Sequence, residues 1–276
     1  MTLPALTDIS LDRRQSTLIA TLNRPQAKNA LNAAIIDGLF ALCDLLQHNS
    51  EIRTLVLRGA GGTFCAGGDI KEFAAQLTAA DPAPGADDPV ATGNRRFGEL
   101  LLKLDALPQV VVSFIEGAAF GGAMGFIAVS DVAIAASDAK FSLSETTLGL
   151  PPAQIGPFVV RKLGLFGARR LALTGARFGA EEAFRTGLID RVAAPGDIEA
   201  ALAATLTDIG RCEPQAIAAT KRIFNRAARA VDPAELDAAA KEFASCLRGA
   251  GRQGAGAFAR KEAPSWVETY PERSEA

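Results

Sequence analysis

The stretch Phe64-Cys65-Ala66-Gly67-Gly68-Asp69-Ile70 decides the fold of this chain. It follows the aliphatic run Thr54-Leu55-Val56-Leu57, which is typical of a buried strand, and it opens into a helical pattern. A second stretch of this kind, Gly117-Ala118-Ala119-Phe120-Gly121-Gly122-Ala123-Met124-Gly125, follows the run from Val110 to Ile115. Glycine and alanine at such turns let a ligand approach the main chain, whose N–H groups can then donate hydrogen bonds. Two such turns predict an oxyanion hole, in which one pre-aimed donor stabilises developing charge by roughly 2.7 to 4 kcal/mol.

Composition narrows the class of protein. The 276 residues suffice for a large core, and 49% hydrophobic with 22% charged residues is typical of a globular protein. A net charge of -2 and a pI near 5.6 argue against nucleic acid or an anionic membrane as a partner. The longest apolar stretch, Ala118 to Val129, is too short to span a bilayer, and Met1 to Ser16 lacks the apolar core of a secretory signal. We therefore expect a cytoplasmic protein with neither a nucleic-acid nor a membrane partner.

Cysteine and histidine usage excludes two kinds of site. Cys43, Cys65, Cys212 and Cys246 have no metal-ligand spacing, so we expect reduced, small core residues and no metal. The single histidine, His48, falls at the polar end of a predicted helix, where a surface role is expected. A Ser-His-Asp or Cys-His nucleophile is therefore set aside.

The first part of the chain alternates predicted strands and helices, which indicates an α/β fold with a parallel or mixed sheet covered by helices. The expected elements before the second glycine turn are a strand at Leu18 to Leu22, a helix from the Asn32 cap through Gln47, the Leu55 strand and a helix from Asp69 to Leu77. The stretch Thr78 to Gly93 predicts a flexible loop, with a mobile lid as the alternative. A helix from Asn94 to Ala106, the Val110 strand, a helix to Val129 and a strand at Val132 to Ala135 follow.

From Pro195 onward the pattern is helical. Leu236, Ala240, Phe243 and Leu247 recur at helical spacing, so a compact core must cover them. The chain is therefore predicted to have a core, residues 1–194, and a C-terminal helical region, residues 195–276.

Further motifs frame the two glycine turns. Asn23-Arg24-Pro25 and Asn29-Ala30-Leu31-Asn32 precede them, while Phe258-Ala259-Arg260-Lys261 and Pro264-Ser265-Trp266 stand near the end. In this order and spacing the motifs resemble the enoyl-CoA hydratase/isomerase (crotonase) superfamily over nearly the whole chain. The resemblance implies a ClpP-like crotonase spiral of β-β-α units and a C-terminal helical region that packs against a neighbouring subunit. It also implies a homotrimer or a hexamer, a dimer of trimers, acting on an acyl-CoA thioester with no separate cofactor.

The resemblance assigns roles to individual residues. The two oxyanion-hole donors fall on the N–H groups of Ala66 and Gly122. Residues matched to the family's coenzyme A site are Arg24, Ala27, Lys28, Ala66, Gly68, Asp69, Ile70, Phe258 and Lys261, the last two meeting the adenine end from a neighbouring chain. Asp69 is also expected to cap the helix that follows it.

The acid/base group is where this chain departs from the family's two-glutamate pattern. One glutamate of that pattern falls at Gly125, which has no side chain, and the other falls at Glu145. Glu145 lies in an otherwise apolar stretch, where the proton affinity of a carboxyl rises toward a useful range. We therefore interpret Glu145 as catalytic, against the alternative of a turn carboxylate in water.

A single glutamate is compatible with several reactions. The stretch Gly149-Leu150-Pro151-Pro152-Ala153-Gln154-Ile155-Gly156-Pro157-Phe158 is similar to the glutaconyl-CoA hydratases that act on methylglutaconyl-CoA or isohexenylglutaconyl-CoA. In those enzymes a distal substrate carboxylate can help to hold the water. The first hypothesis is therefore hydration of a branched or terpenoid enoyl-CoA. An isomerase that shifts a double bond with one base is the second, and a catalytically silent acyl-CoA-binding protein is the third.

Overall fold

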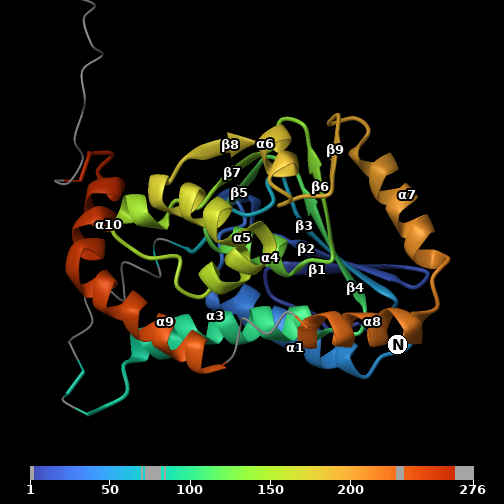
Figure 1. The fold of residues 1–276 in the computed structure, drawn as a ribbon, viewed down its shortest axis with the longest axis horizontal. Helices are drawn as coiled ribbons and strands as arrows, with labels where there is room; N and C mark the ends of the chain where they lie inside the picture. The colour runs from blue at the N-terminus through green and yellow to red at the C-terminus, as the bar shows by residue number, and fades with distance from the viewer. Residues whose placement is uncertain (1–2, 70, 72–81, 84, 228–232, 265–276) are drawn as a thin grey trace, which may run out of the picture.

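The computed structural model describes residues 3–69, 71, 82–83, 85–227 and 233–264. Strands in this part of the chain form a six-stranded sheet in the order β1-β2-β3-β4-β6-β9 and a three-stranded sheet in the order β5-β7-β8 (Figure 1). The strands are β1 Ile9–Arg14, β2 Thr17–Leu22, β3 Thr54–Gly59, β4 Val110–Ile115, β5 Ala118–Phe120, β6 Val132–Ala136, β7 Lys140–Ser142, β8 Arg177–Gly179 and β9 Arg191–Ala193. The helices are η1 Pro25–Ala27, α1 Ala33–Gln47, α3 Pro89–Ala106, α4 Gly122–Val129, η2 Glu145–Leu148, α5 Gly156–Thr174, α6 Ala180–Arg185, α7 Ile198–Gly210, α8 Pro214–Ala227, α9 Pro233–Cys246, η3 Leu247–Gly251 and α10 Arg252–Ala259.

The large sheet is mixed, as the alternation of elements predicted. Strands β2, β3, β4, β6 and β9 run parallel, and β1 pairs antiparallel with β2 at the edge. The inner strands are continuous apolar runs because helices cover both faces of the sheet. The edge strand β1 was not predicted, since its exposed charged residues Asp12, Arg13 and Arg14 hide any apolar alternation.

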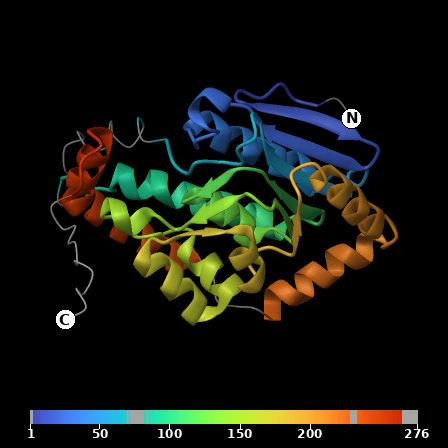
Figure 2. The same cartoon turned by 90° about the horizontal axis from the view of Figure 1, so that it is seen from above.

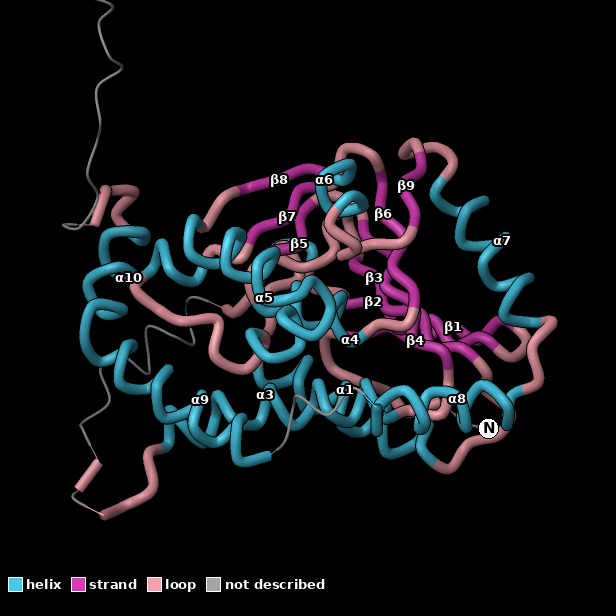
Figure 3. The backbone as a smooth tube through the Cα atoms, in the orientation of Figure 1, coloured by secondary structure: helices cyan, strands magenta, loops and turns pink. Residues whose placement is uncertain are grey.

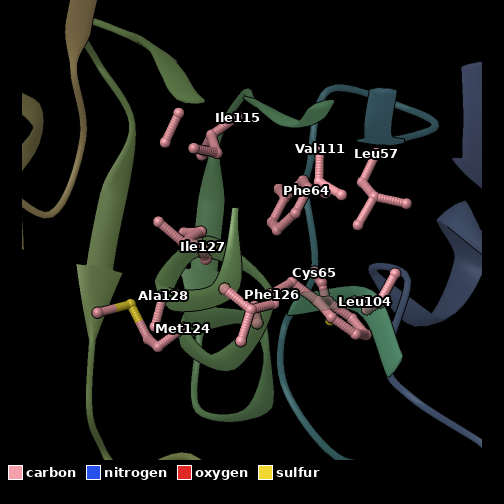
Figure 4. Close-up of a cluster of buried hydrophobic side chains, with 14 of the residues drawn as sticks. Leu57, Phe64, Cys65, Leu104, Val111, Ile115, Met124, Phe126, Ile127 and Ala128 are labelled. Carbon is pink, nitrogen blue, oxygen red and sulfur yellow. The ribbon is translucent and has the colours of Figure 1, made fainter. Parts of the chain in front are cut away.

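The two faces of the sheet bury separate clusters. In β3, Leu55 and Leu57 pack with residues of α1, α3 and α4, whereas Val56 packs on the other face with Ile198 and Leu202 of α7. Figure 2 shows α7 at the opposite end of the molecule from α9 and α10. In the larger cluster, Phe64 and Cys65 lie beside the buried side chains of α4 (Figure 4), so the first glycine turn rests on the core.

Side chains cap the helices that position the site. The Asn32 side chain accepts a hydrogen bond from the Ile35 N–H at 2.9 Å, which confirms the predicted start of α1. In α3, the Asp88 carboxylate accepts from the Val90 N–H at 2.9 Å, and Pro89 takes the first helical position. The predicted loop from Thr78 to Gly93 is therefore wrong at residues 89–93, which are helical. The helix predicted from Asp69 to Leu77 lies mostly outside the described residues.

The C-terminal helices cover their own chain. In the described residues, α9 runs beside α3 (Figure 3), and Ala240, Phe243 and Leu247 pack with Val90 and Ala91 of α3 in one buried cluster. The expectation that a compact core covers this apolar face is therefore confirmed for these residues, and the contact of the C-terminal region with a neighbouring subunit stays a prediction. The division into residues 1–194 and 195–276 stays a prediction.

Candidate active site

Main-chain hydrogen bonds hold the two glycine turns side by side. The Cys65 N–H donates to the Ala118 carbonyl at 3.0 Å, and the Phe120 N–H donates to the Cys65 carbonyl at 3.0 Å. Residues Cys65 and Ala119 thus form a parallel bridge outside the two sheets. Segments that are more than 50 residues apart in the sequence are fixed in one register, as the two-turn hypothesis requires.

Glycine is needed where the turns meet. Gly67 has φ +96°, and a Cβ atom added to it would lie 3.0 Å from the Phe120 carbonyl oxygen and 3.7 Å from the Gly121 Cα atom. Gly121 itself has φ +53°. A larger residue at either position would be strained and would push the turns apart.

The hydrogen-bond pattern changes one of the two predicted donors. The Ala66 N–H already donates to the Lys28 carbonyl at 3.0 Å, so the prediction that Ala66 is an oxyanion donor is wrong. Around Gly68, the Leu31 N–H donates to the Gly67 carbonyl and the Asp69 N–H donates to the Leu31 carbonyl. Because amides alternate in direction along an extended segment, the Gly68 N–H points away from Leu31, toward the second turn.

The second predicted donor, the Gly122 N–H, is consistent with the structure. Gly122 is the first residue of α4, so its N–H has no acceptor within the helix. Among the described residues, the N–H groups of Gly68 and Gly122 have no hydrogen-bond partner. The helix macrodipole adds roughly 0.3 to 1 kcal/mol of stabilisation for an anion at this end of α4.

Glu145 lies directly beside the second turn. A Cβ atom added to Gly121 would be 3.4 Å from Glu145 Oε1, and the Gly121 N–H donates to the Ser142 carbonyl at 3.0 Å. Glu145 Oε2 is shielded from solvent and has no hydrogen-bond partner among the described residues. Burial raises the pKa of Glu145 from its ordinary value of 4.5 to about 7, against a smaller opposing effect from its own main-chain N–H. A carboxyl with this pKa can both take and return a proton near neutral pH.

Apolar side chains fill the space next to Gly125. A Cβ atom at Gly125 would lie 2.7 Å from Ile155 Cγ2 and 3.0 Å from Leu101 Cδ1. Sequence reasoning missed both residues, because only the folded chain brings α3 and the segment before α5 to this helix. A larger side chain at Gly125 would therefore collide with Ile155 and Leu101, and the role of a distal substrate carboxylate in holding the water stays a prediction.

Two residues not singled out individually in the sequence line the hole. A Cβ atom at Gly122 would lie 2.9 Å from Leu31 Cδ1 and 3.5 Å from the Phe97 ring. Phe97 also packs edge-to-face on Phe126 with ring centroids 5.6 Å apart. The i, i+4 spacing of Phe97 and Leu101 on α3 was the available signal for this lining.

The residues matched to a coenzyme A site divide into buried and exposed ones. Arg24 donates to the Asp69 carboxylate at 2.9 Å and to the Ala30 carbonyl at 2.6 Å, and its Nε lies 3.4 Å from Asp8. Its guanidinium is thus held by contacts within the chain, and the match of Arg24 to the coenzyme A site stays a prediction. Asp69 also accepts from the Lys71 N–H at 2.9 Å, which confirms the expected capping contact at the first turn.

The remaining predicted residues are more accessible. Lys28 is exposed in a left-handed conformation with φ +50°, beside half-buried Ala27, while Phe258 and Lys261 are exposed at the end of α10. Ile70 lies outside the described residues. The structure places no ligand at any of these positions, so their contact with coenzyme A stays a prediction.

The cysteine and histidine predictions have mixed outcomes. All four cysteines are free, and Cys43 and Cys65 are buried, which raises the pKa of each thiol to about 12. Cys212 is exposed, so the prediction of a core position is wrong for that residue. His48 is exposed at the end of α1, as expected.

Comparisons with known proteins agree with this geometry. The family model described as "Enoyl-CoA hydratase/isomerase" matches residues 12–269. This chain belongs to the enoyl-CoA hydratase/isomerase family. The crotonase fold expected from the motifs is thereby confirmed, and so is membership of an enzyme family of enoyl-CoA hydratases and isomerases.

Individual relatives of this family member match over most of its length. The structure of Pseudomonas aeruginosa AtuE is 44% identical, has a TM-score of 0.76 and aligns over 95% of this chain and 100% of that one. An enoyl-CoA hydratase/isomerase from Marinobacter aquaeolei is 41% identical, with a TM-score of 0.77, over 95% and 99% of the two chains. The Mycobacterium bovis protein named "Probable enoyl-CoA hydratase echA8" is 34% identical over 79% of this chain and 81% of its own length.

No group of three or more His, Cys, Asp or Glu side chains in the described part of the chain is arranged to hold a metal ion. Within the same ranges, no helix of this family member is both long enough and apolar enough to span a bilayer.

Proposed function

We propose that the protein is a hydratase that adds water to a branched or terpenoid enoyl-CoA, such as isohexenylglutaconyl-CoA or methylglutaconyl-CoA. One observation carries the proposal: the Glu145 carboxyl lies against the second turn, and neither its buried Oε2 nor the neighbouring N–H groups of Gly68 and Gly122 have a hydrogen-bond partner in the described part of the chain. A base and two donors thus converge on one place, which is the arrangement that a thioester enolate needs. The substrate brings coenzyme A with it, and no separate cofactor takes part.

The reaction uses these groups in sequence. The thioester oxygen accepts hydrogen bonds from Gly68 and Gly122, which draws electron density away from the β-carbon. The ionised Glu145 takes a proton from water while the water oxygen bonds to the β-carbon, and the double-bond electrons move onto the thioester as an enolate. Protonated Glu145 then returns the proton to the α-carbon, so one water supplies both the hydroxyl group and the hydrogen.

The acyl specificity rests on the segment from Gly149 to Phe158 and on the walls of the site. Leu31 and Phe97 present apolar surface at Gly122, which suits a branched hydrocarbon chain. Since Ile155 and Leu101 fill the space at Gly125, a distal carboxylate must lie elsewhere in the acyl pocket.

Isomerisation is the second candidate because a single base is enough to move a proton between two carbons of an enoyl thioester. A single carboxyl at Glu145, with the apolar side chains of Ile155 and Leu101 filling the space at Gly125, suits this reaction as well. The catalytically silent reading is weaker, since a buried unpaired carboxyl and two unpaired amides are costly to keep without a use.

Incubation with a panel of thioesters in oxygen-18 water separates the candidates. The panel contains crotonyl-CoA, 3-methylcrotonyl-CoA, 3-methylglutaconyl-CoA, isohexenylglutaconyl-CoA and a 3-enoyl-CoA. We expect mass spectrometry to find one solvent oxygen in the acyl product of a branched glutaconyl thioester. An unlabelled product with a shifted double bond would instead establish the isomerase, and no conversion of any thioester would favour the silent protein.

We also propose a homotrimer or a dimer of trimers. Leu165, Phe166 and Leu173 of α5 are 61%, 85% and 67% exposed, which is unusual for large apolar side chains unless a partner covers them. Sedimentation velocity tests this, and a monomer at micromolar concentration would refute it.

A further inference from the structure

Buried polar atoms without partners are rare, and each one calls for an explanation. On the acyl side of the molecule, three such atoms are hydrogen-bond acceptors: Glu145 Oε2, Asn94 Oδ1 and Gln154 Oε1. Each of them needs a donor that the described residues do not supply.

Asn94 lies on α3, on the helix face that also carries Phe97. Three residues further along the same face, Phe97 packs at Gly122, the second donor. Four residues earlier, Val90 packs in one buried cluster with Leu150, whose N–H donates to the Glu145 carbonyl at 3.1 Å. Helical spacing therefore puts Asn94 on the face of α3 that carries Phe97, beside Gly98, which meets Leu236 of α9.

Gln154 has a different environment. Its Nε2 donates to the Leu236 carbonyl of α9 at 2.9 Å, and its Oε1 would lie 2.0 Å from a Cβ atom on Gly98. Arg95, whose buried Nη1 has an ion pair with Glu99 at 3.6 Å but no hydrogen bond among the described residues, also faces α9 through its 2.7 Å contact with Asp237. These two side chains have partners in the contact between α3 and α9, which leaves Asn94 Oδ1 as the other acceptor to be explained beside Glu145 Oε2.

We propose that Asn94 Oδ1 is the second acceptor for the attacking water, a role that rests on the hydration proposed above. A water molecule has two hydrogens and must keep an oxygen lone pair aimed at the β-carbon. With one O–H donated to Glu145 and the other to Asn94, its orientation is fixed. The amide takes the place of the carboxylate that cannot be built at Gly125, because Ile155 and Leu101 occupy that space.

All protons of the attacking water are accounted for in this step. The O–H that points to Glu145 breaks, its proton moves to the carboxylate and then to the α-carbon, and the water oxygen bonds to the β-carbon. The O–H that points to Asn94 stays intact and becomes the hydroxyl of the product. Asn94 therefore orients the water and exchanges no proton.

Two activities separate this role from a structural one. Hydration requires the positioned water, whereas exchange of the α-hydrogens of butyryl-CoA in deuterium oxide requires only Glu145 and the hole. We expect Asn94→Leu to lower the hydration kcat about 10- to 100-fold while α-exchange stays within about twofold of wild type. Thr92→Val is the matched control, since it removes a hydroxyl from an exposed position of the same helix and should change neither rate.

Asn94→Asp independently tests whether the side chain of residue 94 lies close to Glu145. Its carboxylate is an acceptor, so hydration is retained, and its charge raises the pKa of Glu145, which shifts the hydration pH profile to higher pH. An unshifted profile would place Asn94 away from Glu145 and overturn the proposal. Equal loss of hydration and exchange in Asn94→Leu, or no loss of either, would overturn it too. If wild type exchanges α-hydrogens but never incorporates solvent oxygen, hydration itself fails and this role falls with it.

Discussion

Asp88 and Arg248 form a two-pronged ion pair that ties the first turn of α3 to the η3 turn before α10. Asp88 is at the same time the N-cap of α3, so one carboxylate serves the helix and the C-terminal region together. Both side chains are less than one-fifth exposed, so solvent screens the pair incompletely. The helix that carries Phe97, Leu101 and Asn94 is thereby fixed at its start.

Arg248→Met is expected to lower the free energy of unfolding by about 1 to 3 kcal/mol at pH 7. The Arg248 hydrogen bonds hold the pKa of Asp88 below its ordinary value of 3.8, so this stabilisation is present above that pH and is lost as the pH falls through the folded-state pKa. Urea titrations of both proteins should therefore differ at pH 7 and converge in acid. If the difference in the free energy of unfolding were the same at pH 7 and in acid, the ionised Asp88 carboxylate would not be the source of the stabilisation.

Glu145→Gln should abolish turnover and raise stability above neutral pH. Because the pKa of Glu145 is raised from 4.5 to about 7, the wild type loses stability as the pH rises through that window, and glutamine does not titrate. The variant should gain about 1 to 3 kcal/mol relative to wild type between pH 4 and pH 8. Thermal unfolding at both pH values measures this, and a variant that is less stable at pH 8 would show that the carboxylate is a structural partner.

The same pKa predicts the pH profile of the wild-type reaction. Hydration begins with ionised Glu145, so kcat/KM should rise with pH and level off above about pH 7. A profile that is flat from pH 5 to pH 9 would contradict Glu145 as the base.

Gly122→Pro tests the hole by removing the N–H proposed as a donor. Proline is well tolerated at the first position of a helix, but its Cβ would press on Leu31 Cδ1, so Gly122→Ala, which adds the same Cβ and keeps the N–H, is the matched control. We expect kcat to fall by about a hundredfold or more with an unchanged circular dichroism spectrum. Full activity in a folded variant would exclude this N–H as a donor.

Gly125→Glu should not restore a two-carboxylate hydratase. The new side chain would clash with Ile155 and Leu101 inside the core, and we expect a loss of about 3 kcal/mol or more in urea titrations. Crotonyl-CoA hydration should not improve. A stable variant with higher activity would mean that the segment before α5 moves aside easily.

Arg24 and Lys28 should respond differently to substitution. Arg24→Met breaks partly buried contacts to Asp69 and Asp8 and should lower stability by about 2 to 4 kcal/mol. Lys28→Asn keeps a residue that tolerates positive φ and should raise KM for the thioester about threefold without a change in Tm. A higher KM for the thioester in Arg24→Met, without a loss of stability, would instead indicate that Arg24 binds coenzyme A.

Local signals in the sequence accounted for much of the fold, whereas the resemblance to the family pointed to Glu145. The aliphatic runs before each glycine turn, and Asn32 at the start of α1, depend only on neighbouring residues, and all of them were found in place. The Asp88-Pro89 pair carried a helix start of the same local kind, which was missed within a loop-like composition.

The errors arose where distant segments compete for the same group. Whether Ala66 or Gly68 offers a free N–H depends on Lys28 and Leu31, which lie on another segment. The contacts of Arg24 depend on Asp69, 45 positions away, and the side chains that fill the space at Gly125 come from two other helical regions. No local pattern contains this information.

The packing of α9 on α3 has a consequence for how the molecule is made. Every strand of both sheets precedes α9 in the chain, so the ribosome delivers the whole sheet before it delivers the cover for Val90 and Ala91. A nascent chain can thus bury its sheet early, while this apolar face of α3 stays exposed to water until α9 is made. A chain that terminates within α9 would consequently expose Val90 and Ala91, aggregate and depend on chaperones, rather than fold into a smaller enzyme.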